Sequence, residues 1–191
     1  IQNGVARNAL VIGTEHLSIG IDWTDRSTCV LFGDGSGAVV LEASDQPTGL
    51  LSFDLGSDGS GWDAIIVPGC GGANPASQQV LEHRLQYLRM DGQRVYKFAT
   101  RIMSDSVAKV IAGSGLSLDD VALIIPHQAN ERIIEVARRR LGVPPEKMMV
   151  NIARYGNTSA ASIPIALTEA VEQGRVKPGD HLVFTSFGAG L

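Results

Sequence analysis

The chain has 191 residues and a mass of 20.2 kDa, enough for one ordinary domain or for one domain with part of another. Sixteen Lys and Arg against 20 Asp and Glu give a formal net charge of -4, which provides no general basic field and argues against nucleic acid as a partner. The hydrophobic fraction of 44% and the charged fraction of 19% are typical of a chain that buries a core and exclude disorder by composition.

Short apolar runs separated by turn residues are predicted to organise the first half of the chain. The predicted strands of this half are residues 8–13, 37–41 and 50–55. A polar loop lies at 24–28, and the turn-rich segment 44–49 is the candidate domain boundary. Residues 56–77 are rich in Gly, Pro, Ser and Asn, which predicts a long irregular excursion.

Helices and strands alternate in the second half. Apolar residues at helical spacing, followed by glycine, predict helices over residues 92–113, 131–141 and 159–172. Short apolar runs predict strands over residues 121–125, 148–151 and 181–185. This alternation predicts a layered α/β fold rather than a helical bundle or a β-sandwich.

Membrane insertion and secretion are not expected. Apolar runs such as 121–125 are far shorter than the roughly 20 residues that span a bilayer, and no charged-then-apolar secretory segment opens the chain. Because Ile1 is not a start methionine, the sequence alone does not exclude a leader segment that has been removed. Cys29 and Cys70 make neither a disulfide framework nor a metal cluster, so a cytoplasmic setting is expected. Neither cysteine has neighbours that would make it a nucleophile.

The glycine-rich segment 33–37 resembles a dinucleotide-binding loop only superficially. Such a loop leaves a strand and opens a helix, whereas this segment leads into the apolar run 38–41. The context favours a tight turn with close backbone packing.

His127 follows the apolar strand 121–125 and Pro126, at the carboxyl end where open α/β sheets carry their sites. It either caps the next helix or acts as an acid or base near neutral pH, and its position favours the second interpretation. Asn157 lies in a run of small residues before another helix, where taken alone an N-cap is the more ordinary interpretation. The segment 187–190, Phe-Gly-Ala-Gly, either presents backbone N–H groups to an oxyanion or forms a plain turn.

Together these segments are more specific than any one of them. Residues 126–133, 156–162 and 187–190 resemble the β-ketoacyl-acyl-carrier-protein synthase III family, thiolase-fold enzymes that start bacterial fatty-acid synthesis. Further resemblances lie at residues 24–26, 32–35, 58–60 and 90–92. The resemblance implies a thiolase-like fold with α-β-α-β-α layers. Residues 1–44 would be the end of its first half-domain and residues 45–191 most of its second.

The resemblance also implies the chemistry, which uses a Cys-His-Asn triad. His127 and Asn157 match its last two members, while the nucleophilic cysteine is expected before residue 1. The implied reaction is a decarboxylative Claisen condensation of an acyl-CoA primer with malonyl-acyl-carrier protein, without a metal or cofactor. His127 and Asn157 would stabilise the enolate, Phe187 would exclude water, and the backbone around Gly188, Ala189 and Gly190 would hold the other oxyanion.

Partner sites follow from the same resemblance. Trp23 and Arg26 match the family's loop for the adenine and phosphate of CoA, and a homodimer is implied. The residues expected to dock the acidic carrier protein are Lys97, Gln128, Ala129, Asn130, Glu131, Arg132, Arg139 and Arg140. The alternative for the arginines is a solvated helix face.

Two other functions remain open at this point. One is a related thiolase-fold condensing enzyme of polyketide or quinolone type, with a different acyl donor. The other is a half-chain that binds carrier protein without catalysis. The residues leave the length and branching of the primer open.

Overall fold

The computed structural model describes residues 1–46 and 48–191. Its strands are β1 (Asn8–Glu15), β2 (Gly35–Glu42), β3 (Ile65–Ile66), β4 (Arg89–Met90), β5 (Val121–Pro126) and β6 (His181–Thr185). Its α-helices are α1 (Gln78–Glu82), α2 (Gly92–Ser114), α3 (Glu131–Leu141), α4 (Ile152–Tyr155) and α5 (Ser162–Glu172). Short 3-10 helices are η1 (Leu17–Gly20), η2 (Gly59–Gly61), η3 (Leu118–Asp120), η4 (Pro145–Lys147) and η5 (Ser159–Ala161).

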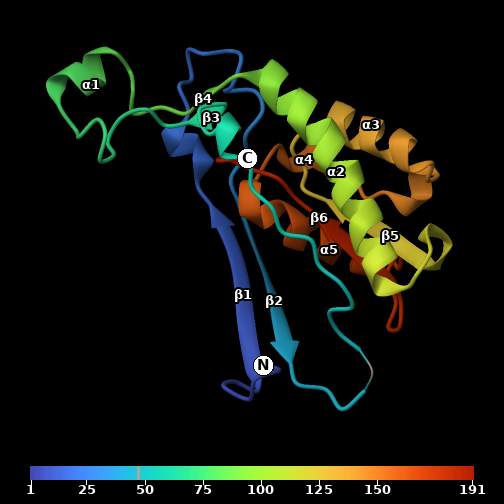
Figure 1. Ribbon diagram of the computed structural model, residues 1–191. Helices are drawn as coiled ribbons and strands as arrows, with labels where there is room; N and C mark the ends of the chain where they lie inside the picture. Colours follow the sequence, from blue (N-terminus) through green and yellow to red (C-terminus); the bar gives the residue numbers. More distant parts are fainter. Residues whose placement is uncertain (47) are drawn as a thin grey trace.

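The parallel pair β5–β6 forms the centre of the molecule, with helices on both faces (Figure 1). Its side chains alternate between the two faces. One face carries Ile124 and Val183 into a core shared with α2 and α3. The opposite face carries Leu123 and Ile125 against α5. This arrangement confirms the predicted α/β layers, and it leaves the carboxyl ends of both strands at one edge.

The antiparallel ribbon β1–β2 packs against η5 and the start of α5 through glycines (Figure 1). A Cβ added at Gly13 would lie 2.4 Å from the Ala160 carbonyl oxygen, and one at Gly37 would lie 2.9 Å from Pro164. Only glycine permits so close an approach. The close backbone packing predicted for segment 33–37 is therefore confirmed, but the predicted tight turn is not formed, because residues 35–37 already belong to β2.

The main helices begin and end where capping residues stand. Asp91 accepts hydrogen bonds from the backbone N–H groups of Gln93 and Arg94 at the start of α2. Asn130 accepts from the Arg132 N–H at the start of α3. Both helices end at glycines with positive φ, Gly115 and Gly142.

Two predicted strands are not formed. Residues 50–55 are extended but belong to no strand, because they run along α2, where Asp54 pairs with Lys109 at 3.4 Å, and no strand among the described residues pairs with them. Residues 148–151 contribute a single bridge, Ile124↔Met148. The excursion contains η2 and β3, and α1 follows directly after it; the sequence predicted none of these three elements.

The connector 44–49 includes residue 47, which lies outside the described residues, so the proposed domain boundary stays a prediction. Within the described ranges, no helix combines the length and the apolar character that crossing a membrane requires.

Candidate active site

His127 is fixed at the carboxyl end of β5. Its backbone N–H donates to the Thr185 carbonyl at 2.8 Å, which continues the β5–β6 pairing by one residue. The side chain is buried, and its ring meets the Phe187 ring edge-on, with centroids 5.7 Å apart and planes 71° apart. The parallel strands thus bring the two predicted residues His127 and Phe187 together.

Ser162, the first residue of α5, contacts the His127 ring. The Ser162 Oγ lies 2.6 Å from the His127 Nδ1 and accepts a hydrogen bond from the Gln128 backbone N–H at 3.3 Å. The hydroxyl has one proton and two acceptor lone pairs, so it can either donate to Nδ1 or accept from an Nδ1–H. In the tautomer with an unprotonated Nδ1, the hydroxyl donates to Nδ1, and the Nε2–H is a hydrogen-bond donor.

Burial lowers the pKa of His127 from 6.5 to about 4. Transfer of the imidazolium out of water is unfavourable, and the Ser162 hydroxyl offers no compensating charge. The ring is therefore neutral at pH 7, which suits a donor that stabilises a developing oxyanion.

We expect an NMR titration of His127 in the full-length protein to show a midpoint near pH 4. Above about pH 6.5 the ring is neutral in both the folded and the unfolded protein, so it does not change the stability. Between pH 6.5 and 4 only the unfolded chain gains the proton, so the folded state loses about 3 kcal/mol as the pH falls. The difference between wild type and His127→Gln isolates this part of the acid sensitivity. A midpoint at or above 6.5 would contradict the burial argument.

Asn157 lies two residues before η5 begins. Its side-chain Oδ1 accepts from the Ser159 N–H at 2.9 Å. The N-cap position of η5 is occupied by Thr158, so Asn157 forms an Asx-type turn rather than the predicted N-cap. Its backbone N–H donates to the Leu31 carbonyl at 2.8 Å, and its carbonyl accepts from the Gly33 N–H at 2.9 Å. Because the oxygen of the amide is engaged, the NH2 group is the part of the side chain available to a ligand. His127 contacts Ser162, the first residue of α5, so both residues lie near the amino end of that helix.

Gln128 does not belong to a docking surface. Its side chain is 1% exposed, donates to the carbonyls of Pro126 and Met149, and accepts from the Asn151 N–H at 2.9 Å. The prediction that it contacts the carrier protein is wrong, because a side chain that completes three internal hydrogen bonds is not available to a partner. It instead ties the end of β5 to the segment before α4.

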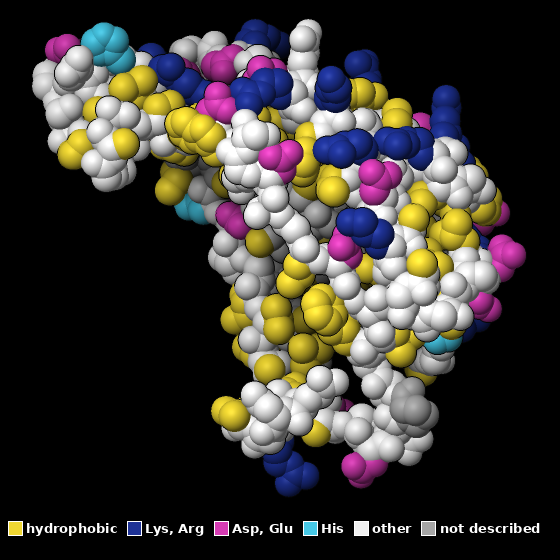
Figure 2. Space-filling view, in the orientation of Figure 1, with side chains coloured by type: hydrophobic (Ala, Val, Ile, Leu, Met, Phe, Trp, Pro, Cys, Tyr) yellow, Lys and Arg dark blue, Asp and Glu magenta, His cyan; other side chains and the backbone are white. Residues whose placement is uncertain are grey.

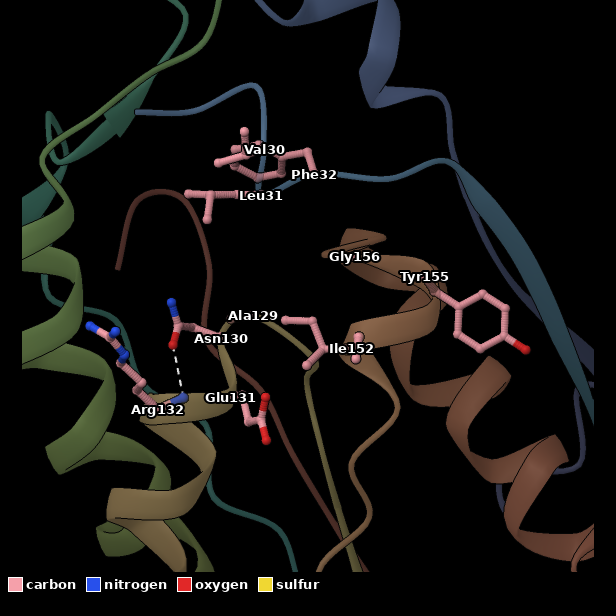
Figure 3. A pocket seen from close by; sticks show the side chains of 11 residues that line it. Val30, Leu31, Phe32, Ala129, Asn130, Glu131, Arg132, Ile152, Tyr155 and Gly156 are labelled. Atoms are coloured by element: carbon pink, nitrogen blue, oxygen red, sulfur yellow. Dashed lines mark hydrogen bonds between the residues drawn. The ribbon is translucent and has the colours of Figure 1, made fainter. Parts of the chain in front are cut away.

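A cavity of about 540 Å³ is lined by sequence neighbours of His127 and Asn157, though not by these two residues themselves (Figure 3). Its walls come from segment 30–32, from the start of α3 at 129–132, and from α4 with Gly156. Ala129, Asn130, Glu131 and Arg132 therefore line this cavity, while the cap from Asn130 fixes the first turn of α3. The wall formed by 30–32 was missed, because an apolar run carries no signal of lining a cavity.

The loop with Trp23 and Arg26 lies on the surface. Both side chains are exposed, and the Trp23 Nε1 donates to the Ser18 carbonyl at 3.2 Å. Asp22 in the same loop accepts two hydrogen bonds from Arg84, which lies shortly after α1, at 2.5 and 2.6 Å. This contact could not be predicted, because the two residues are far apart along the chain.

Basic side chains gather over α2 and α3 (Figure 2). Lys97, Arg132, Arg139 and Arg140 are all exposed. Arg139 pairs with Glu135 at 2.6 Å, and Arg140 lies 3.7 Å from Asp105. In the part of the chain that the structure describes, Arg132 makes no ion pair, which leaves its charge available at the cavity rim.

The closing segment after β6 is a turn. The Leu191 N–H donates to the Gly188 carbonyl at 3.0 Å, and Gly188, Ala189 and Gly190 are exposed. The turn predicted as one interpretation is thus formed, and an oxyanion role for its backbone stays a prediction.

Comparison with known proteins places these residues in a family. The family described as 3-oxoacyl-[acyl-carrier-protein (ACP)] synthase III matches residues 1–59, and its C-terminal counterpart matches residues 111–191. Among curated relatives, the β-ketoacyl-[acyl-carrier-protein] synthase III of Roseiflexus sp. (strain RS-1) is 52% identical over 191 residues, and that of Symbiobacterium thermophilum is 50% identical. The chain is covered completely in both alignments but spans only 58% of each relative.

Solved structures agree with this assignment. The synthase III structure from Thermus thermophilus matches with a TM-score of 0.90 at 45% identity, covering 100% of this chain and 58% of that one. The Aquifex aeolicus structure matches with a TM-score of 0.89 at 45% identity, covering 100% and 57%. The fold is therefore the thiolase-like fold that the sequence predicts, and the chain belongs to the 3-oxoacyl-[acyl-carrier-protein] synthase III family.

Proposed function

We propose that the protein condenses an acyl-CoA primer with malonyl-acyl-carrier protein, the step that initiates fatty-acid biosynthesis. The observation that carries the proposal is the pair of neutral donors at the amino end of α5. In this proposal the buried, neutral His127 ring carries its proton on Nε2, and the Asn157 amide, whose oxygen accepts from Ser159, directs its NH2 group to the substrate. Two neutral donors suit an enolate oxygen, which gains negative charge as carbon dioxide leaves.

In the proposed reaction, a cysteine thiolate takes the acyl group from CoA as a thioester and releases the CoA thiol. Malonyl-carrier protein then loses carbon dioxide, and the electron pair of the broken C–C bond forms the enolate held by His127 and Asn157. The enolate carbon attacks the acyl carbonyl, a new C–C bond forms, and the bond from that carbonyl to the cysteine sulfur breaks. Phe187 supports this step, because its edge-on contact with His127 helps to keep water away from the ring.

The cysteines of this chain do not supply that thiolate. Cys29 is half-buried in an apolar run, and Cys70 is exposed in the glycine-rich excursion. We expect intact-mass analysis of the full-length protein, after incubation with a series of acyl-CoAs, to show one added acyl group at a residue other than these two. A Cys29→Ala, Cys70→Ala double variant should be acylated equally. An acyl group mapped to Cys29 or Cys70, or no acylation by any primer, would contradict the proposal.

The cavity and its rim accommodate the substrates in this proposal. The cavity beside 129–132 would admit the narrow thioester arm that CoA and carrier protein share, and Trp23 with Arg26 would contact the CoA nucleotide. Arg132, Arg139, Arg140 and Lys97 would attract the acidic carrier protein, because local basic charge on a net-acidic protein steers an acidic partner. No cofactor is required, since both thioesters are substrates.

Reversing the charge of this face should weaken the use of carrier protein more than the use of CoA. We expect Arg132→Glu together with Arg139→Glu to lower kcat/KM for malonyl-carrier protein by about 30-fold at low salt, since two exposed charges contribute about 1 kcal/mol each. The loss should shrink at high ionic strength, and kcat/KM for acyl-CoA should change little. Steady-state kinetics with each substrate varied, at two salt concentrations, measures both.

Lys177→Glu provides the matched control, because it reverses an exposed charge in the loop between α5 and β6. Equal losses for both substrates, or a loss that ignores salt, would mean that the arginines form only a solvated face or stabilise the fold.

A polyketide-type priming enzyme is the second candidate. The priming β-ketosynthase from the R1128 polyketide biosynthetic pathway matches with a TM-score of 0.83 at 36% identity. The higher identity to the synthases of Roseiflexus and Symbiobacterium favours fatty-acid initiation. A cytoplasmic homodimer completes the proposal, as the family resemblance implies. Binding of carrier protein without any acylation would favour the non-catalytic alternative.

A further inference from the structure

Glu169 is a carboxylate that the proposed reaction does not use, and it lies in the interior. It stands on the middle of α5, with only 7% of its surface exposed, between the buried residues Ala166 and Ala170. A buried carboxylate is unfavourable unless it is paired and hydrogen-bonded, so its partners explain why the fold tolerates it.

All of its partners come from one short segment, the helix α4 and the residue before it. One oxygen accepts from the Asn151 Nδ2 at 2.8 Å. The other accepts from the Tyr155 hydroxyl at 2.7 Å and forms an ion pair with Arg154. Figure 3 shows the Tyr155 ring directed away from the cavity. A helix of four residues is not stable by itself, so this carboxylate holds both of its ends.

The position of α4 determines where Asn157 begins. The helix ends at Gly156, whose N–H donates to the Ile152 carbonyl at 2.7 Å and whose φ is +69°. Asn157 follows directly. At the other end of α4, the Asn151 N–H donates to Gln128, the residue after His127. Glu169 and its three partners, Asn151, Arg154 and Tyr155, form what we call the Glu169 cluster. Through α4 this cluster is connected to Asn157 at one end and to Gln128, the neighbour of His127, at the other.

The charge of the cluster is consistent with this arrangement. Burial works to raise the pKa of the Glu169 carboxyl, but hydrogen bonds from Asn151 and Tyr155 and the charge of Arg154 outweigh it and hold the pKa below 4.5. The carboxyl is thus ionised at neutral pH, and it raises the pKa of the Tyr155 hydroxyl that donates to it.

We propose that Glu169 is a positioning residue for Asn157: it fixes α4 and thereby aims the Asn157 NH2 group at the enolate oxygen. The inference rests on the proposed function for its catalytic consequence, and on the contacts above for its geometry. Glu169 itself touches neither the reacting atoms nor His127, so its effect is transmitted through α4.

Glu169→Gln tests the proposal, because it retains the shape of the side chain but removes the charge that faces Arg154 and turns one acceptor into a donor. In the full-length protein, we expect kcat for decarboxylation of malonyl-carrier protein to fall by about 10- to 100-fold, since small misplacements have effects of this size. Acyl transfer from CoA and the KM for malonyl-carrier protein should stay within about twofold. Glu172→Gln removes the same charge from an exposed position one turn further along α5 and should leave both half-reactions unchanged.

A second measurement does not depend on activity. In protein labelled with ¹⁵N-asparagine, the Asn157 NH2 resonances should shift or broaden in Glu169→Gln and stay in place in Glu172→Gln. If Glu169→Gln does not fold, Tyr155→Phe removes a single hydrogen bond to the same carboxylate and should move the same resonances to a smaller extent.

Unchanged Asn157 resonances in the Glu169 or Tyr155 variant would overturn the positioning role. Equal losses in both half-reactions, together with a lower Tm, would also overturn it and leave Glu169 a residue of stability alone. If wild-type protein neither takes an acyl group nor decarboxylates malonyl-carrier protein, the proposed function is wrong. The Asn157 NH2 resonances of the Glu169 and Tyr155 variants then still test whether Glu169 positions Asn157.

Discussion

Asn157→Ala and His127→Ala are each expected to lower decarboxylation of malonyl-carrier protein by about 100- to 1,000-fold in the full-length protein. Each removes one of the two neutral donors to which we assign the enolate oxygen. Acylation by acyl-CoA should be partly retained, because the thiolate carries out that half-reaction and the enolate donors act later. Carbon dioxide release without primer measures the first half-reaction, and intact mass measures the second.

Asn157→Asp separates the two roles of this residue. An aspartate oxygen can accept from the Ser159 N–H as the asparagine oxygen does, so this turn-forming hydrogen bond is retained. The NH2 donor is replaced by a carboxylate oxygen, which repels the enolate. Decarboxylation should therefore fall at least as far as in Asn157→Ala, while Tm stays closer to that of the wild type.

His83→Ala and Asn74→Ala are the matched controls, since both residues are exposed, Asn74 in the excursion and His83 directly after α1. Neither should change either half-reaction. If His127→Ala and Asn157→Ala reduced acylation and decarboxylation equally, the division of labour between thiolate and enolate donors would be wrong.

Gly33→Ala should unfold the protein or reduce its stability by about 3 kcal/mol, the upper part of the range for overpacking. A Cβ at this position would lie 2.0 Å from the Tyr155 carbonyl oxygen, which is backbone and cannot rotate away. To make room, segment 31–33 would have to separate from Asn157 and break the hydrogen bonds on both sides of that residue. Any folded variant should therefore also lose decarboxylation.

Urea unfolding of the full-length protein measures this loss as a shift in the midpoint at constant slope. Gly56→Ala is the control, because a Cβ there would meet nothing within 4 Å. Wild-type stability in Gly33→Ala would show that segment 31–33 can separate from α4 and Asn157 without loss of stability.

The sequence predicts well where a local pattern determines the structure. Helices α2 and α3 follow from apolar spacing and glycine stops, and β5 and β6 follow from short apolar runs. The placing of His127 follows from its strand, because the end of a parallel strand is a fixed location. The prediction for 50–55 fails, since a strand is defined by a partner, and this segment lies along α2 instead.

The buried residues that support the candidate site could not be predicted. Gln128 follows His127 in the motif that carries the family resemblance, which suggested a role at the surface. Its side chain instead donates to two buried carbonyl groups, those of Pro126 and Met149. Ser162 is one of several small residues in the run after Asn157, and nothing local distinguishes it. For Glu169 the sequence contains one indication, which is a carboxylate among the apolar residues of the helix predicted over residues 159–172. Burial of such polar groups depends on segments that meet only in the folded protein.

The bridge between Phe32 and Asn157 has a consequence for how the protein folds. It joins segments near opposite ends of the chain, and contacts so distant in sequence form late because closing a long loop costs entropy before any contact compensates for it. During synthesis, the ribbon β1–β2 leaves the ribosome well before η5 and α5 exist to cover its glycines. Until then the face that carries Gly13 and Gly37 is uncovered, whereas Leu10 and Val40 on the ribbon stay exposed even in the folded chain. A nascent chain stopped before residue 155 would hold His127 and the glycine-rich segment 33–37, yet it could not complete the active site.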